Sequence, residues 1–214
     1  MFINNKTRWF EIISVIVTGL FKFIFVNVLE FQLLFIIISI TFWTSYIVYQ
    51  YSKNSNLLNY WGFTKKNFLK CFKTTGAFAL LCIVLFIAYG MYNQVEVNKL
   101  HLLYILLLYP VWGTIQQFMV MSLVLGNLKD MVSAKIPLAI LILISSLLFS
   151  AVHIPSLALM LITFILALYY SQVFLKYRNL LPLGFFHGMI GGFYYYYVLN
   201  QDPWLEIARV VSGF

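Results

Sequence analysis

The sequence predicts an all-α protein, a polytopic transmembrane helix bundle of about seven to eight spans. Three observations lead to this prediction: 63% of the 214 residues are hydrophobic, only 9% are charged, and the mean hydropathy is +0.91. An ordinary soluble domain has about 25% charged residues, so a water-soluble globule of this composition would expose too much apolar surface. The apolar residues also form long continuous runs, unlike the ~10-residue alternating segments of a transmembrane β-barrel.

Seven apolar runs are long enough to cross a bilayer, because a helical span needs about 20 residues. We expect these spans at residues 10–29, 31–50, 74–92, 101–125, 136–153, 156–175 and 180–199. Residues 1–214 would then form a single integral-membrane domain. The tail 203–214 is too short to cross. We expect it either at the membrane interface or as a partial eighth helix against the bundle.

The Lys and Arg residues are distributed unevenly between the two ends of these spans. If the N-terminus is cytoplasmic, 11 of the 14 lie in cytoplasmic segments and only Lys99 and Arg209 lie outside, while Lys22 falls within the first span. An excess of Lys and Arg is typical of cytoplasmic loops. We therefore predict an integral protein of a bacterial-type cell membrane with its N-terminus in the cytoplasm. The net charge of +8 is interpreted as this topology signal, and no nucleic-acid partner is predicted.

The longest connector, residues 51–73, mixes aromatic side chains with five lysines. This composition favours a short amphipathic helix in the headgroup region of the membrane. The alternative is a plain basic connector.

Three polar sites lie within the apolar runs: Gln116-Gln117, His153 and His187. An unpaired polar group in lipid costs several kcal/mol, so such residues pair with one another or line a cavity. Adjacent residues of a helix point about 100° apart, so at least one glutamine should face the bundle interior. Each site alone could be a hydrogen-bonded packing contact between helices. Because they come from three different spans, we expect them to share one polar cavity.

No metal or other cofactor is predicted for this cavity. A zinc site normally takes three or four protein ligands, and only His153 and His187 lie at membrane depth. His101 sits at the outer start of its span, and the chain has no HExxH motif. The helical rise places His153 about 10 Å from the depth of Gln116. A span that is shifted or broken around Pro137 and Pro155 would close this gap.

The order and spacing of these sites resemble the CPBP family, the CAAX-protease and bacteriocin-processing intramembrane endopeptidases that include the CAAX prenyl protease 2 type. That family carries an EExxxR motif on one span, FxxxH on the next and HxxxN on a later one. Here Phe149-Ser-Ala-Val-His153 matches the second motif, and His187-Gly-Met-Ile-Gly191 resembles the third. Gln116-Gln117 falls where the family has its two glutamates. The resemblance covers a core of about residues 105–200.

Several positions depart from the family pattern. Gln116 and Gln117 replace both glutamates, Met121 stands at the position of the arginine, and Gly191 stands at the position of the terminal asparagine. A glutamine has no basic form near neutral pH and cannot accept a proton from water, although it can orient a water molecule. Among the acidic residues, only Glu11 is placed where a deeply packed first helix could bring it towards the site.

The resemblance implies an intramembrane endopeptidase. In the family, the first glutamate and the two histidines activate a water, while the asparagine and the second histidine stabilise the oxyanion. The candidate catalytic residues are therefore His153, His187, Gln116 and Gln117.

The implied substrate is a peptide or membrane-protein segment that reaches the site from the lipid bilayer. Activity would be weakened or altered by the two glutamines. The alternative is a non-catalytic pseudoprotease that acts as a membrane binding, immunity or scaffold protein. A transporter or channel subunit would be marked by inverted repeats, and the sequence shows none.

Overall fold

The computed structural model describes residues 3–132 and 135–212, and this part of the chain folds into helices joined by short connections. In chain order the elements are α1 (Asn5–Lys22), η1 (Phe23–Val28), α2 (Gln32–Lys53), α3 (Asn56–Trp61), α4 (Phe68–Tyr92), α5 (Lys99–Gln117), η2 (Phe118–Gly126), α6 (Asn127–Val132), α7 (Leu138–Ala151), α8 (Leu157–Tyr177), α9 (Leu181–Tyr197) and α10 (Pro203–Ser212). The two η segments are π-helical and continue α1 and α5 without a break.

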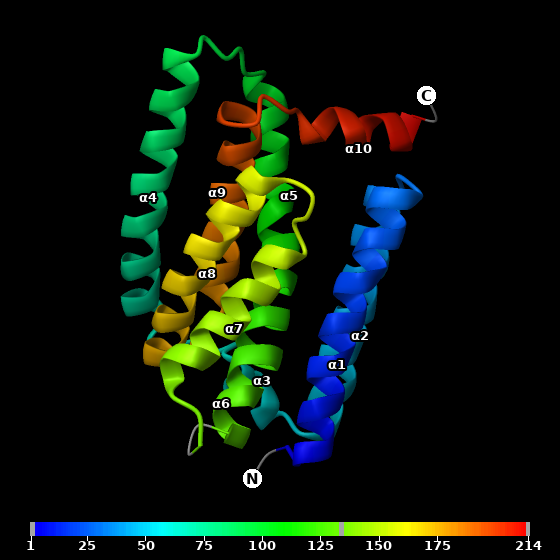
Figure 1. Ribbon diagram of the computed structural model, residues 1–214, viewed down its shortest axis with the longest axis vertical. Coiled ribbons are helices and arrows are strands. Elements are labelled where there is room, and N and C mark those ends of the chain that lie inside the picture. Colours follow the sequence, from blue (N-terminus) through cyan, green and yellow to red (C-terminus); the bar gives the residue numbers. More distant parts are fainter. Residues whose placement is uncertain (1–2, 133–134, 213–214) are drawn as a thin grey trace.

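The helices form a bundle in which α1 and α2 stand together along one side of the remaining helices (Figure 1). Within the described residues, five helical stretches are long and apolar enough to cross a membrane: Asn5–Val28, Gln32–Lys53, Phe68–Tyr92, Lys99–Val132 and Leu157–Tyr177. The other two expected spans are the shorter helices α7, with 14 residues, and α9, with 17. The predicted all-α membrane bundle is confirmed, because each of the seven apolar runs is helical.

Small residues allow α5 and α9 to pack backbone against backbone. A Cβ atom added at Gly188 would lie 2.4 Å from the nitrogen of Pro110, and one added at Gly184 would lie 2.3 Å from Oγ1 of Thr114. A Cβ on Gly113 would likewise come within 2.7 Å of the carbonyl oxygen of Gly184. This close approach sets the relative height of the two helices, and therefore of Gln116 and His187, which they carry.

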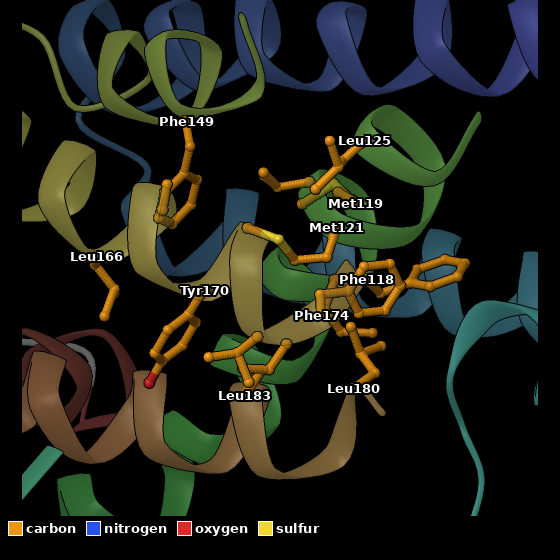
Figure 2. Packing of buried hydrophobic residues seen from close by; sticks show 14 of the residues in the cluster. Phe118, Met119, Met121, Leu125, Phe149, Leu166, Tyr170, Phe174, Leu180 and Leu183 are labelled. Atoms are coloured by element: carbon orange, nitrogen blue, oxygen red, sulfur yellow. The ribbon is translucent and has the colours of Figure 1, made fainter. Parts of the chain in front are cut away.

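The core centres on η2, whose nine residues are all buried. Figure 2 shows Phe118 and Met121 of this segment packed among side chains of α8 and α9. The Phe118 ring also packs edge-on against Trp61 and Trp43, with ring centroids 5.2 and 6.2 Å apart. A π-helical run of this length has no signature in the sequence. It depends on the packing of its neighbours.

The connector 51–73 contains a short helix, as we predicted, but Leu57 and Trp61 of this helix are buried in the protein core. Lys53 ends α2 and Phe68 begins α4, which leaves the six-residue α3 between them. Trp61 at the end of α3 is 0% exposed, and its carbonyl oxygen accepts a hydrogen bond from Ser122 of η2. The aromatic residue expected in the headgroup region is thus a core residue, because burial of its large ring against Phe118 is more favourable than an interfacial position.

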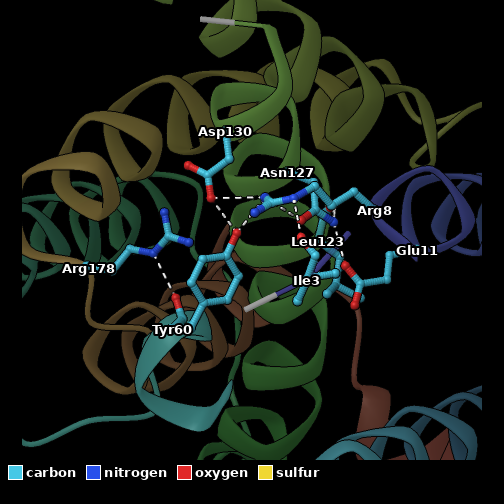
Figure 3. A network of polar contacts seen from close by, with 8 residues as sticks. All are labelled: Ile3, Arg8, Glu11, Tyr60, Leu123, Asn127, Asp130 and Arg178. Atoms are coloured by element: carbon cyan, nitrogen blue, oxygen red, sulfur yellow. Dashed lines mark hydrogen bonds and ion pairs between the residues drawn. The ribbon is translucent and has the colours of Figure 1, made fainter. Parts of the chain in front are cut away.

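A buried polar network fastens α1 to the core near the N-terminus (Figure 3). Arg8 is 2% exposed, and its Nη1 lies 2.9 Å from Oδ2 of Asp130 and 2.6 Å from the hydroxyl of Tyr60. Glu11, which is fully buried, accepts hydrogen bonds from Nδ2 of Asn127 at 2.6 Å and from the hydroxyl of Tyr46 at 2.5 Å. Burial and the adjacent Asp130 carboxylate raise the pKa of Tyr60 to about 12, so its hydroxyl stays protonated.

The C-terminal helix α10 lies across the end of the bundle, as expected for a tail that does not cross (Figure 1). Asp202 holds its start: its carboxylate is 2.6 Å from Nδ1 of His101, accepts the hydroxyl hydrogen of Tyr196 at 2.6 Å and accepts the backbone N–H of Trp204 at 3.0 Å. Burial opposes ionisation of Asp202, but the hydrogen bonds from Tyr196 and His101 outweigh it and lower its pKa.

Candidate functional site

Helix α7 is too short to reach across the membrane, and this places His153 at the site. Its 14 residues begin after Pro137 and rise only about 21 Å, against a hydrocarbon core of about 30 Å. The chain then turns through residues 152–156, and His153 lies in this turn rather than at the outer end of a full span. The turn lies well short of the end of the bundle that carries α10 (Figure 1). The depth gap expected from the sequence is closed in this way.

His187 and Gln116 are joined directly. Nε2 of His187 lies 2.9 Å from Oε1 of Gln116, so the imidazole N–H donates to the side-chain carbonyl. His187 is only 9% exposed, and its other nitrogen, Nδ1, has no hydrogen-bond partner in the part of the chain that the structure describes. The contact follows from the small residues between α5 and α9, which bring the two backbones together.

Phe149 links the two histidines. Its ring centroid lies 5.2 Å from that of His153, edge-on, and 5.5 Å from that of His187. Its carbonyl oxygen is 2.9 Å from Nδ1 of His153, one helical turn further along the chain. This bond assigns the Nδ1 proton to His153 and leaves Nε2 as an acceptor. The FxxxH spacing therefore orients the imidazole as well as packing it.

A cavity of about 460 Å³ opens between the α1–α2 pair and the core helices. Gln116, Phe149 and His153 line it from the core side, together with the buried Ser145. The opposite wall comes mainly from apolar side chains of α1, η1 and α2. His187 does not line the cavity and supports Gln116 from behind. Three of the four candidate site residues are therefore close together: Gln116 and His153 line the cavity, and His187 contacts Gln116 from behind.

Gln117 is placed differently from its neighbour. Its side chain is 0% exposed, does not line the cavity, and neither of its polar atoms has a hydrogen-bond partner among the described residues. Nothing in its surroundings connects it to His153 or His187, and its catalytic role stays a prediction. Glu11 does not approach the site either, because it is engaged by Asn127 and Tyr46.

Met121 and Gly191, the two other positions expected to differ from the family motifs, have simple local environments. Met121 is fully buried, and its sulfur lies 3.7 Å from Oγ of Ser171. At Gly191 an added Cβ would meet only Cδ2 of Tyr109, at an ordinary 3.8 Å, so this position has room for a larger side chain.

Lys22 and Asn27 were missed as site residues by the sequence reasoning. Both line the cavity from the junction of α1 and η1, facing the turn that holds His153. The available signal was the lysine within the first apolar span, because an ionisable residue at membrane depth marks a functional position by default.

No group of three or more His, Cys, Asp or Glu residues suited to a metal ion occurs in residues 3–132 and 135–212.

A helical membrane bundle with an FxxxH histidine and a glutamine lining one cavity, and a second histidine behind the glutamine, resembles the CAAX-protease-like membrane proteins. Residues 97–193 match the family model for type II CAAX prenyl endopeptidase Rce1-like proteins of the CPBP family, so this segment is similar to that family. The match contains Gln116, His153 and His187 but not α1 to α4. No curated protein and no solved structure matches the chain.

Proposed function

We propose that the protein is an intramembrane endopeptidase of the CAAX-protease type in which His153, rather than a glutamate, accepts the proton of the attacking water. The family match and the membrane-spanning helices support the reaction class. The contact that favours His153 is the bond between its Nδ1 and the Phe149 carbonyl oxygen, because it leaves Nε2 as a basic nitrogen on a side chain that lines the cavity. A neutral imidazole is the commonest general base in enzymes.

Gln116 has a different part in this proposal from that of the family's glutamate. Its carbonyl oxygen is occupied by the N–H of His187, so its amide N–H groups are the polar atoms left for the cavity. Such donors stabilise the negative charge that develops on the carbonyl oxygen of a peptide bond under attack. His187 then acts as a positioning residue, which holds the carboxamide in the orientation that presents these donors.

The missing carboxylate sets the expected rate. A well-placed general base contributes roughly 10²–10⁴-fold to a rate, and a histidine without an acidic partner recovers only part of this factor. We expect slow turnover of peptide or membrane-protein segments that enter the cavity from the lipid. The family match names a prenyl endopeptidase, and the mostly apolar lining of the cavity does not distinguish a prenyl group from another apolar substrate.

The proposed orientation places the N-terminus in the cytoplasm. The eleven basic residues expected on that side fall at the N-terminal start of α1, the α2–α4 connection, the α6–α7 region and the α8–α9 junction. These segments lie at one end of the bundle, the end opposite α10 (Figure 1). A cysteine placed in either end of the protein and labelled with an impermeant maleimide on intact cells would test this orientation.

The test of the proposed function is cleavage of a peptide library by the purified protein in lipid vesicles, with the products identified by mass spectrometry. His153→Ala should abolish cleavage, and Gln116→Ala should reduce it by about 10²-fold, the cost of one oxyanion donor. His101→Ala is the matched control, because this histidine lies outside the cavity and contacts Asp202. Cleavage that persists unchanged in His153→Ala would remove this residue from the mechanism.

A second candidate is a non-catalytic member that binds a peptide or partner in the same cavity. The observation that favours it is the lining itself, which contains no aspartate or glutamate among the described residues. The two functions separate in one experiment, since a peptide bound with full occupancy and recovered intact after long incubation supports the binding function alone.

A further inference from the structure

Lys22 sits at the rim of the cavity without an acidic partner. Its Nζ lies 3.1 Å from Oδ1 of Asn27 and 3.2 Å from the carbonyl oxygen of Ile154, and both of these acceptors are neutral. Lys22 belongs to neither of the ion pairs Arg8–Asp130 and His101–Asp202. Lys22 is thus the one formally charged side chain among the described residues that line the cavity.

The positive charge of Lys22 has no negative charge beside it to offset the cost of its burial. An ammonium group at membrane depth is costly unless a negative charge or several strong acceptors accompany it. It has three N–H donors, of which Asn27 and Ile154 use two. Asn27 also donates from Nδ2 to the same Ile154 oxygen at 3.4 Å. A negatively charged group entering the cavity would therefore find a donor and a formal charge that the protein leaves uncompensated.

The rest of the lining restricts what could carry that negative group. Most side chains around the cavity are apolar, among them Phe35, Trp112 and Leu148. The occupant should then have an apolar body and one anionic group. A peptide with a carboxylate next to an apolar stretch has this form, and its carboxylate would lie beside the turn that carries His153.

We propose that Lys22, with Asn27, is a carboxylate-binding subsite that selects the peptide and sets which bond lies opposite His153. The carboxylate comes from an acidic side chain or from the C-terminus of the peptide. The inference depends on the proposed function, because that function makes a peptide the occupant. Ile154 couples the two elements: its carbonyl oxygen binds Lys22, and its backbone follows His153 directly.

The experiment measures binding separately from cleavage. Fluorescent peptides with one common apolar sequence are added to the protein in phosphatidylcholine nanodiscs. One peptide carries a glutamate and an amidated C-terminus, the second a glutamine and a free C-terminus, and the third a glutamine and an amidated C-terminus. We expect at least one carboxylate peptide to bind about tenfold more tightly than the neutral one, the effect of one charge-assisted hydrogen bond. The peptide that shows the gain identifies the source of the carboxylate.

Three variants assign the effect to Lys22. Lys22→Gln keeps a donor for the Ile154 oxygen and should remove the difference between the peptides, whereas Lys22→Arg should retain it. Lys99→Gln is the matched control, because it removes the same charge from an exposed lysine of α5 that does not line the cavity. Melting curves of all variants show that each one is folded.

Three results would overturn the inference. The first is equal binding of all three peptides to the native protein, and the second is an undiminished preference in Lys22→Gln. The third is loss of the preference when phosphatidylglycerol replaces part of the phosphatidylcholine. If the native protein, but not Lys22→Gln, also retains phosphatidylglycerol, the subsite binds a lipid headgroup instead of a peptide. Cleavage is followed in the same samples. A retained preference without cleavage contradicts the proposed endopeptidase alone, and cleavage without a preference contradicts the carboxylate subsite alone.

Discussion

The imidazole of His187 donates a hydrogen bond of 2.9 Å to the side-chain carbonyl oxygen of Gln116, and this bond joins α9 to α5 at the wall of the cavity. A glutamate at position 116 would accept the same bond with a full negative charge, and charged hydrogen bonds are roughly twice as strong as neutral ones. The structure thus provides the hydrogen bond that would hold an acid at position 116, while the ionisable group is absent.

Gln116→Glu should raise the rate of peptide cleavage. The new carboxylate would face the cavity beside His153 and act as a stronger acceptor for the water proton. A full general base is worth about 10²–10⁴-fold, of which the lost amide donor of Gln116 removes about 10²-fold. The measurement is the initial rate with the best peptide substrate. Gln117→Glu is the control: its side chain is fully buried and away from the cavity, so the substitution should lower the melting temperature without a gain in rate. A gain confined to Gln117→Glu would contradict the assignment of Gln116.

Gly188→Ala should destabilise the protein and separate the two halves of the site. The added methyl group would lie 2.4 Å from the backbone nitrogen of Pro110, which cannot rotate away. Overpacking of this kind typically costs about 1–3 kcal/mol. Gly191→Ala, on the same helix, meets only a ring atom at 3.8 Å and should be neutral or slightly stabilising, because alanine favours a helix over glycine. Thermal unfolding in detergent compares the two, and equal melting temperatures would show that α5 and α9 are not in backbone contact.

Arg8→Ala should destabilise the docking of α1 far more than Lys6→Ala. Arg8 is 2% exposed and pairs with Asp130, so its removal leaves a partly buried carboxylate and the hydroxyl of Tyr60 without their shared donor. Breaking a buried ion pair typically costs about 3–5 kcal/mol. Lys6 is exposed on the same helix and should change stability by about 0.5 kcal/mol or less. Hydrogen exchange along residues 5–22 and the melting temperature are the measurements.

The attachment of α10 should weaken in acid. The pKa of Asp202 lies below its ordinary value of 3.8 in the folded protein, so its carboxylate stabilises the fold above this pH. That contribution is lost as the pH falls through the lower folded-state value. Proteolysis within residues 203–212 should therefore accelerate below about pH 3.8. In Asp202→Asn the same segment should be cleaved more readily already at neutral pH, with little further change in acid. An unchanged pH profile in this variant would show that another group holds α10.

Much of the fold could be predicted because a bilayer imposes simple rules on a sequence. Runs of about 20 apolar residues must be helical, since no water satisfies their backbone groups. The pairing of Gln116 with His187 was also accessible, because the glycines around His187 indicate close helix packing. The helix lengths were harder to predict. Helix α7 ends at Ala151 and leaves His153 in a turn, and the apolar run alone does not show where the chain reverses.

The remaining features depend on contacts between distant segments. Arg8 and Glu11 lie at the start of an apolar span, where a loop-facing position was the simpler expectation. Both are buried, with partners from α2, α3 and α6. Trp61 is also buried, although the connector that contains it was expected in the headgroup region. Its position depends on Phe118, a residue 57 positions later in the chain. The sequence pattern within one helix does not predict such partners from distant segments.

The backbone contact between α5 and α9 has a consequence for how this protein can change. Position 116 is held by glycines and a proline rather than by the side chain that occupies it, so an acid and its amide fit the same place. Glutamate and glutamine codons differ by a single nucleotide. In the proposed endopeptidase, one base change at this codon would thus exchange the amide for an acid, with no rebuilding of the helices that surround it.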